Sequence, residues 1–333
     1  MASLTLPGWY KEVFVKSIFV SDLTAGMELV NEAFLLQEVG RRSTKDDRPY
    51  LLCTLRDKTG QLNGIFWNVP DYVNNWTQSG QVVLITGRVN LYKEALQVNI
   101  TDINQEAQPD LAIFLPTSSR SVEDMLAELK AYIADLHEPW QTLVSALLLT
   151  EPLMSSFINA PAARGMHHAY LGGLLEHTLS MTKLASYLSQ HYDYVNKDLL
   201  IAGTLLHDMG KAIEYSVDTS FDFSEDGRLV GHIVRAIVMI ETAARELDFP
   251  ETKLRHLVHL VASHHGKLEW GSPVQPKTIE AVLLHQIDLL DSRMQGFIDH
   301  ISNDPGDNPW SSKSSNMFGT ELRRPEAIYR YSY

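Results

Sequence analysis

With 333 residues, the chain is long enough for two domains of ordinary size, and its 44% hydrophobic and 21% charged residues exclude disorder throughout. The single cysteine, Cys53, excludes a disulfide scaffold and a thiolate zinc module. A net charge of −13 argues against tight nucleic-acid binding by the whole surface, although it leaves room for a local basic groove. No apolar run is long enough to span a bilayer, and Met1–Gly26 lacks the pattern of a signal peptide, so we expect a cytoplasmic protein with no membrane partner.

The first segment of the chain shows short strands separated by turns. The expected strands are Glu32–Glu38, Tyr50–Asp57, Gln61–Trp67, Gln81–Val89 and Leu96–Asp102, with a short helix at Pro70–Trp76. Five strands with a helix between the third and the fourth resemble the OB-fold, so we expect residues 16–105 to form an OB-fold β-barrel. In that fold, the face of strands two and three and the flanking loops hold single-stranded nucleic acid.

Basic and aromatic residues of this segment suit such binding. The candidates are the cations after the first strand and three aromatic residues, namely Arg41, Arg42, Lys45, Arg48, Phe66, Trp67 and Tyr92. Cations attract the phosphate backbone, and aromatic rings stack on bases. Three alternatives stay open: the basic loop is simply solvated, the aromatic residues pack the barrel core, or the barrel docks another protein.

The rest of the chain follows a helical pattern and holds all 13 histidines. Residues 106–120 contain Pro109 and Pro116, show no clear period and predict a linker. Apolar residues then recur at helical spacing, which predicts helices at about 121–136, 139–149, 168–191, 197–207, 230–247, 251–263 and 276–301. We therefore expect an all-α bundle at 121–302, followed by a C-terminal extension at 303–333.

Nitrogen and oxygen donors come from five successive helices of this bundle. They are His177, His207 with Asp208, His232, His264 with His265, and Asp288. A helical bundle builds metal sites by projecting side chains inward from several helices. Asp208 and Asp288 lie in apolar runs, where a charged carboxylate is costly unless it is paired or bound to a metal. A lone histidine is more often packed or at the surface, which we expect for His137, His191, His256, His259 and His300.

These donors carry a family resemblance. His177, His207-Asp208 and Asp288 match the H…HD…D signature of the HD-domain metal-dependent phosphohydrolases, and the further histidines resemble the members that hold two metals. The strings around His167–Thr178, Ser263–Gly266 and His285–Asp288 are similar to those of the YhaM-type 3′-to-5′ exoribonucleases. That family also places an OB-fold before its HD domain, so the resemblance covers about residues 16–310.

The resemblance implies a site for one or two divalent ions. One ion would be held by His177, His207, Asp208 and Asp288, and a second would share Asp208 and take His232, His264 and His265. Imidazole and carboxylate ligands without thiolate suit Mn²⁺, Co²⁺, Fe²⁺, Zn²⁺ or Mg²⁺, of which we expect Mn²⁺. Asp208 is the central catalytic candidate. Lys211 would either bind a phosphate oxygen or serve as a positive charge near the C-terminal end of a helix. His168 would contact the substrate, protonate the leaving group or support a metal ligand.

We therefore expect a metal-dependent 3′-to-5′ exoribonuclease that hydrolyses single-stranded RNA to nucleoside 5′-monophosphates, with single-stranded DNA as an open second substrate. One alternative is an HD phosphohydrolase that acts on a small nucleotide or a cyclic dinucleotide, which the acidic balance of the chain favours. Another is a regulatory protein without catalytic activity, which the intact set of donors disfavours. A homo-oligomer also stays open.

Overall fold

The computed structural model describes residues 16–93, 95–105, 113–165, 168–217, 221–304, 308–311, 313 and 316–325. The chain separates after Pro116 into two compact units, which we name the barrel unit and the helical unit. The predicted linker is described from residue 113 onward. The Ile113 carbonyl accepts a hydrogen bond from the Lys58 N–H of the barrel unit (N···O 2.9 Å), and Thr117 forms a β-bridge with Leu171 of the helical unit.

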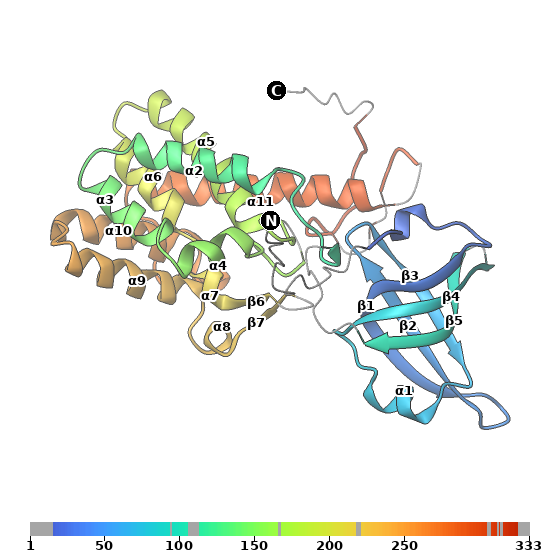
Figure 1. Cartoon of the computed structure of the whole chain (residues 1–333). Coiled ribbons are helices and arrows are strands. Elements are labelled where there is room, and N and C mark those ends of the chain that lie inside the picture. Colours follow the sequence, from blue (N-terminus) through green and yellow to red (C-terminus); the bar gives the residue numbers. More distant parts are fainter. Residues whose placement is uncertain are drawn as a thin grey trace, which may run out of the picture. The chain divides into compact units, whose positions relative to one another are not determined.

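The strands of the barrel unit close into a barrel in the order β1-β2-β3-β5-β4 (Figure 1). Their bounds are β1 (Glu28–Ser43), β2 (Pro49–Asp57), β3 (Gly60–Trp67), β4 (Val82–Tyr92) and β5 (Ala95–Gln105), and helix α1 (Asp71–Trp76) follows β3. Neighbouring strands run antiparallel except for β3 and β5, which run parallel. This closed barrel with a helix between its third and fourth strands confirms the predicted OB-fold.

Strand β1 continues well beyond the predicted end at Glu38. Arg41 pairs with Leu51 and Arg42 with Tyr50, so both arginines lie on a strand and not in the predicted loop. The end of β1 is mostly exposed, and its side chains therefore lack the apolar alternation that marks a strand in the sequence. The Arg41 guanidinium donates to the carbonyl oxygens of Asn74 (2.8 Å) and Thr77 (2.6 Å), which ties β1 to the end of α1.

Apolar side chains from all five strands fill the interior of the barrel. They include Leu29, Phe34, Leu36, Leu51, Leu55, Phe66, Val83, Ile85, Val89, Val98 and Ile100. Successive residues on a strand point to opposite faces, so Phe66 points inward whereas Trp67, which is 50% exposed, points outward. Phe66 is therefore a core residue of the barrel, as the second alternative expected. This corrects its prediction as a base-stacking residue.

The helical unit is a bundle around one apolar core (Figure 1). Its longer helices are α2 (Val122–Ala134), α3 (Trp140–Leu148), α4 (Leu153–Asn159), α5 (Gly173–His191), α6 (Lys197–Leu206), α9 (His232–Glu246), α10 (Glu251–Ser263) and α11 (Ile279–Asn303). Helix α6 lies at the centre of the bundle, and every one of its residues from Leu199 to Leu206 is buried. The bundle confirms the predicted helical domain and places the end of α6 in the interior.

Short elements that the sequence did not predict connect α6 to α9. They are α7 (Lys211–Glu214), β6 (Tyr215–Val217), β7 (Phe221–Phe223) and α8 (Glu225–Leu229), and the two strands form an antiparallel hairpin. Helix α5 also begins five residues later than predicted, at Gly173. The backbone before it is left-handed at His168 (φ 47°) and Gly172 (φ 79°), so these residues form a loop that leads into the helix.

Among the described residues, no single helix is long and apolar enough to cross a membrane. Helices α3 and α4 reach the required length and hydropathy only as a pair, and the break between them bends the pair by 76°. Both helices contribute to the core, where Leu143 and Phe157 are fully buried. The apolar side chains of these two helices therefore pack inside the bundle.

Candidate metal centre

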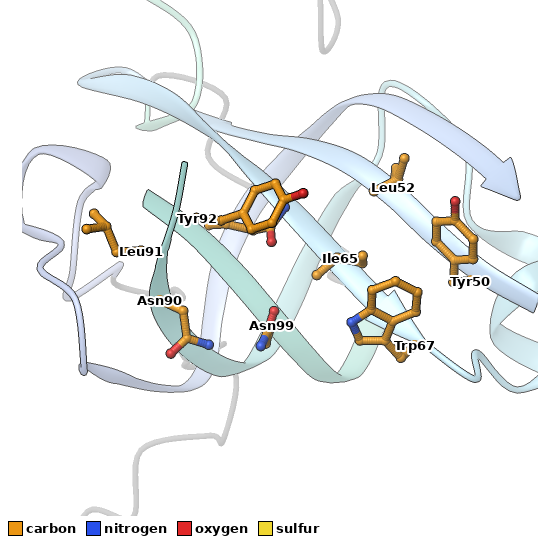
Figure 2. A pocket seen from close by; sticks show the side chains of 9 residues that line it. Tyr50, Leu52, Ile65, Trp67, Asn90, Leu91, Tyr92 and Asn99 are labelled. Carbon is orange, nitrogen blue, oxygen red and sulfur yellow. The ribbon is translucent and has the colours of Figure 1, made fainter. Parts of the chain in front are cut away.

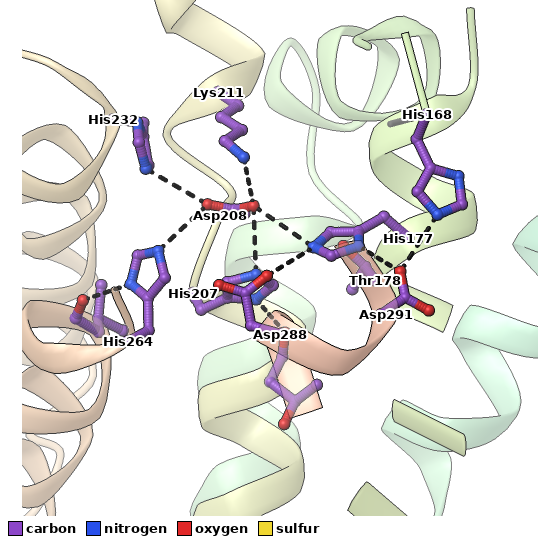
Figure 3. Close-up of polar contacts among 12 residues, drawn as sticks. His168, His177, Thr178, His207, Asp208, Lys211, His232, His264, Asp288 and Asp291 are labelled. Atoms are coloured by element: carbon purple, nitrogen blue, oxygen red, sulfur yellow. Dashed lines mark hydrogen bonds and ion pairs between the residues drawn. The ribbon is translucent and has the colours of Figure 1, made fainter. Parts of the chain in front are cut away.

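Helix ends bring most of the predicted donors together inside the bundle. His207 and Asp208 directly follow α6, His264 and His265 directly follow α10, and His232 is the first residue of α9. The remaining two donors come from within helices, His177 from α5 and Asp288 from α11. Figure 3 shows Asp208 with His232 and His264 on one side and His177 on the other.

The Asp208 carboxylate is the common point of two groups of donors. Its Oδ2 atom lies 3.2 Å from His207 Nε2 and 3.7 Å from His177 Nε2. Its Oδ1 atom lies 3.4 Å from His232 Nε2 and 3.5 Å from His264 Nε2. One carboxylate therefore faces two sets of imidazoles with its two oxygen atoms, as a ligand shared by two ions would.

The first group consists of His177, His207, Asp208 and Asp288. The donor atoms of His177, His207 and Asp208 lie within 4.8 Å of one another. Asp288 joins them through its Oδ1 atom, which is 3.5 Å from His177 Nε2. Two carboxylates and two imidazoles form a donor set that suits a divalent ion of the first transition row or Mg²⁺.

The second group consists of His232, His264, His265 and the Oδ1 atom of Asp208. The donor atoms of the three histidines lie within 4.8 Å of one another. Their rings are also close, with centroids 4.4 Å apart for His264 and His265 and 5.3 Å apart for His232 and His265. Three imidazoles and a shared carboxylate again form a donor set for a divalent ion.

Hydrogen bonds at Nδ1 fix the orientation of three of the histidines. The Nδ1 atoms of His207 and His264 donate to carbonyls three residues back, Thr204 O (2.8 Å) and Val261 O (2.7 Å). His265 Nδ1 donates to the Trp270 carbonyl at 2.9 Å. Because each Nδ1 carries the proton, each Nε2 keeps a lone pair for an ion.

Unpaired buried atoms show that this centre fits a metal ion. Across the described residues, no hydrogen-bond partner is present for the Nε2 atoms of His207, His232 and His264 or for Oδ1 of Asp208, although all four are buried. Buried polar atoms without partners are rare in folded proteins because leaving them unpaired is costly. A cation at each of the two groups would give all four atoms a partner.

The charges of the site also suit cation binding. Burial raises the pKa of Asp208, but Lys211 and His207 outweigh it and hold that pKa well below its ordinary value, so Asp208 is an anion. Burial lowers the pKa of His264 to about 4, an effect that Asp208 only partly offsets. His264 is thus neutral at pH 7, which is the form that binds a metal.

Lys211 lies beside the donor groups, in contact with Asp208. Its Nζ atom is 2.7 Å from Asp208 Oδ2, and the side chain is almost completely buried. Burial lowers the pKa of Lys211, but Asp208 outweighs this and raises it above its ordinary value, so the ammonium group keeps its charge. A fixed positive charge therefore lies beside the shared carboxylate.

His168 lies behind the first group. Its Nε2 atom donates to Asp291 Oδ2 at 3.2 Å, and its Nδ1 atom is 2.7 Å from the Tyr170 hydroxyl, which donates to Glu176 at 2.9 Å. Asp291 Oδ2 also accepts a hydrogen bond from His177 Nδ1 at 2.7 Å. Both ring nitrogens of His168 thus contact protein side chains, and the residue reaches the donors through Asp291. The preceding residue of the matched string, His167, lies outside the described residues.

A pocket on the outside of the barrel unit is lined by three aromatic residues (Figure 2). Tyr50, Leu52, Ile65, Trp67, Asn90, Leu91, Tyr92, Gln97 and Asn99 line it. The predicted residues Trp67 and Tyr92 are present, and Tyr50 stacks on Trp67 with ring centroids 4.8 Å apart. Tyr50 was missed, although folding the hairpin about its Gly60 turn places it opposite Trp67 in register.

The predicted basic residues are not gathered in this pocket. Arg41 contacts the end of α1, and Arg42 lines a neighbouring pocket that shares Leu52, Tyr92 and Gln97 with the aromatic one. Lys45 and Arg48 belong to the turn after β1, where Arg48 forms an exposed ion pair with Asp46 at 3.3 Å. None of the four predicted cations therefore lines the aromatic pocket, and Arg42 lies in the pocket beside it.

Together, the barrel and the donor groups define a class of protein. An OB-fold barrel followed by a helical unit with converging His and Asp residues is the architecture of an HD-domain hydrolase joined to a nucleic-acid-binding fold. The family model of the HD domain matches residues 174–293, and that of the OB-fold nucleic acid binding domain matches residues 38–105. Among solved structures, the second OB-fold domain of replication protein A from Methanococcus maripaludis covers 27% of this chain and 94% of its own length at 21% identity, with a TM-score of 0.19.

Similar proteins extend over both units. The 3′-5′ exoribonuclease YhaM of Geobacillus sp. (strain WCH70) is 34% identical over 270 residues, which are 80% of this chain and 83% of that protein. The 3′-5′ exoribonuclease YhaM of Listeria welshimeri serovar 6b is 37% identical over 268 residues, 78% of this chain and 84% of that protein. The chain belongs to the YhaM 3′-5′ exoribonuclease family, and it is a metal-dependent hydrolase of phosphodiester bonds.

Proposed function

We propose that this protein is a 3′-to-5′ exoribonuclease that degrades single-stranded RNA to nucleoside 5′-monophosphates, and that single-stranded DNA is a second substrate. The observation that carries the proposal is the Asp208 carboxylate, which faces two groups of imidazoles with its two oxygen atoms. Paired sites of this kind are common in enzymes that cleave phosphodiester bonds. The two YhaM relatives support the direction of degradation and the RNA substrate.

His177, His207, Asp208 and Asp288 would hold one divalent ion, and Asp208, His232, His264 and His265 the other. Such ions supply Lewis-acid polarisation of the scissile phosphate and an activated water nucleophile. The donors are neutral imidazoles and carboxylates, for which Mn²⁺ is our first choice among Mn²⁺, Co²⁺, Fe²⁺, Zn²⁺ and Mg²⁺.

Two further residues take distinct roles in this proposal. The Lys211 ammonium, fixed 2.7 Å from Asp208 Oδ2, lies where it can pair with a phosphate oxygen and hold the scissile group at the donors. His168 holds the Asp291 carboxylate with one nitrogen and contacts the Tyr170 hydroxyl with the other. Of the three roles predicted for His168, this geometry favours support of a ligand over contact with substrate or proton transfer.

The barrel unit would hold the strand whose end is being degraded. Trp67 (50% exposed) and Tyr92 (57% exposed) present rings to solvent, and Asn90 and Asn99 line the same pocket with amide groups. Exposed rings stack on unpaired bases whatever their sequence, which suits an enzyme that must process any RNA. We also place the enzyme in the cytoplasm, where its one cysteine, Cys53, stays a buried free thiol.

The direct test is digestion of a single-stranded RNA of about 20 nucleotides labelled at its 5′ end, with metal-free protein to which Mn²⁺ is added back. We expect a ladder that shortens from the 3′ end, with nucleoside 5′-monophosphates as the released products, and no digestion in the presence of a chelator. Degradation from the 5′ end, or internal cuts, would contradict the proposal. Turnover of cyclic dinucleotides or nucleoside triphosphates with intact RNA would instead support the small-nucleotide alternative.

A further inference from the structure

Two histidines of the metal centre differ from the others in what their Nδ1 atoms contact. His177 Nδ1 donates to the Asp291 carboxylate at 2.7 Å, and His232 Nδ1 donates to the Glu214 carboxylate at 3.0 Å. The three other histidines of the centre donate to uncharged backbone carbonyls. His177 belongs to the first group and His232 to the second, so each group contains one imidazole that is hydrogen-bonded to a carboxylate.

Asp291 is built into the bundle as a fixed anion. It is 8% exposed, and it accepts hydrogen bonds from His177, from His168 at 3.2 Å and from the Ser180 hydroxyl. Three donors therefore fix both oxygens of Asp291, and the His177 ring has one orientation relative to them.

Glu214 is held just as tightly at the second group. It is 7% exposed, and its Oε1 atom accepts hydrogen bonds from both the backbone N–H (3.1 Å) and Nδ1 of His232. Helix α8 packs directly over it, because a Cβ atom at Gly227 would lie 2.3 Å from the Glu214 carbonyl oxygen and 2.9 Å from its Cγ. The close approach at Gly227 thus keeps Glu214 against the start of α9.

We propose that Asp291 and Glu214 are positioning residues, one for each metal ion, that orient His177 and His232 and strengthen them as ligands. The inference rests on the two-ion centre of the proposed function. A carboxylate that accepts the Nδ1–H bond of an imidazole fixes its tautomer and increases electron density at Nε2. A neutral carbonyl fixes the tautomer with less effect on the ligand strength, so each group gains one strong imidazole.

The test uses calorimetric titration of Mn²⁺ into metal-free full-length protein. The variants Asp291→Asn and Glu214→Gln keep the shape of each side chain and remove its charge. We expect Asp291→Asn to weaken the ion of the first group by about 10- to 100-fold and to leave the second unchanged, with the reverse for Glu214→Gln. The ligand variants His177→Ala and His232→Ala identify which binding step belongs to which group, because each removes its own step.

Glu280→Gln is the matched control. Glu280 is also buried (7% exposed) and accepts a backbone hydrogen bond, from Asn196 at 2.9 Å. It lies eight residues before Asp288 on α11, about 12 Å away along the helix axis. We expect this variant to bind Mn²⁺ like the parent protein. Thermal unfolding of each metal-free variant shows whether the bundle itself is changed.

The outcomes separate the two proposals. If neither His177→Ala nor His232→Ala removes a binding step, the two-ion centre itself is wrong. If both remove a step but Asp291→Asn and Glu214→Gln bind Mn²⁺ like the parent protein, the centre stands and the positioning role is overturned. The positioning role is also overturned if each carboxylate variant weakens both steps equally and lowers the unfolding temperature, since that result describes a general loss of packing.

Discussion

Replacing Asp208 with asparagine should lower RNA hydrolysis by about 10³-fold or more. Asp208 faces one group of donors with each of its two carboxylate oxygens, and the variant keeps its shape while it removes the charge that would attract the proposed cations. The loss corresponds to about 4 kcal/mol of transition-state stabilisation, a modest value for removal of metal-ion catalysis. The measurement is the single-turnover rate with 5′-labelled RNA and added Mn²⁺.

Asp198→Asn provides the control for this variant. Asp198 lies in the first turn of the same helix, α6, where it pairs with the exposed His137 at 3.1 Å. We expect it to retain the parent rate. Because Asp208→Asn also leaves Lys211 without its anionic partner, its circular dichroism spectrum must match that of the parent protein before the rates are compared. A folded Asp208→Asn protein with the parent rate would refute the assignment of the centre.

The double variant Trp67→Ala/Tyr92→Ala should raise the KM for long RNA by about 30-fold or more. Stacking contributes about 1–3 kcal/mol per base, so loss of two rings removes at least about 2 kcal/mol of binding. Hydrolysis of a small phosphodiester such as bis(p-nitrophenyl) phosphate should stay within about twofold, because this substrate has no strand for the rings to hold. Steady-state kinetics on both substrates provides the comparison.

Tyr72→Ala is the matched control within the barrel unit. Tyr72 is 67% exposed on α1 and does not line the aromatic pocket, so its loss removes a ring of similar exposure from elsewhere on the same barrel. We expect no change in KM for either substrate. An equal loss on RNA and on the small phosphodiester in the double variant would show that the barrel unit acts on the centre and not on the strand.

Local patterns in the sequence made much of the metal centre predictable. His207-Asp208 follows an apolar helix with no break, and a carboxylate in that setting needs a partner. Glu214 had no such signal. It precedes a hairpin that was not predicted and lies eighteen residues before His232, so only the packing of α8 and α9 shows that the two are in contact. Glu214 is thus less visible in the sequence than the donor that it contacts.

The barrel shows the same difference between local and non-local information. Its strands alternate clearly enough to predict five of them, and the turn at Gly60 fixes the register that pairs Tyr50 with Trp67. The end of β1 was missed because its exposed, basic residues lack alternation. Its partner strand and the carbonyls at the end of α1 decide its conformation, and these contacts come from residues distant in the sequence.

The composition of the aromatic pocket has a consequence for the proposed binding of a polyanion by an acidic protein. Within the described part of the barrel unit, none of the residues that line the pocket carries a charge. Binding through rings and amides releases few counterions, so the affinity should depend only weakly on ionic strength. With its net charge of −13, the protein would then repel loosely associated nucleic acid, while a strand bound to the rings as proposed would be retained.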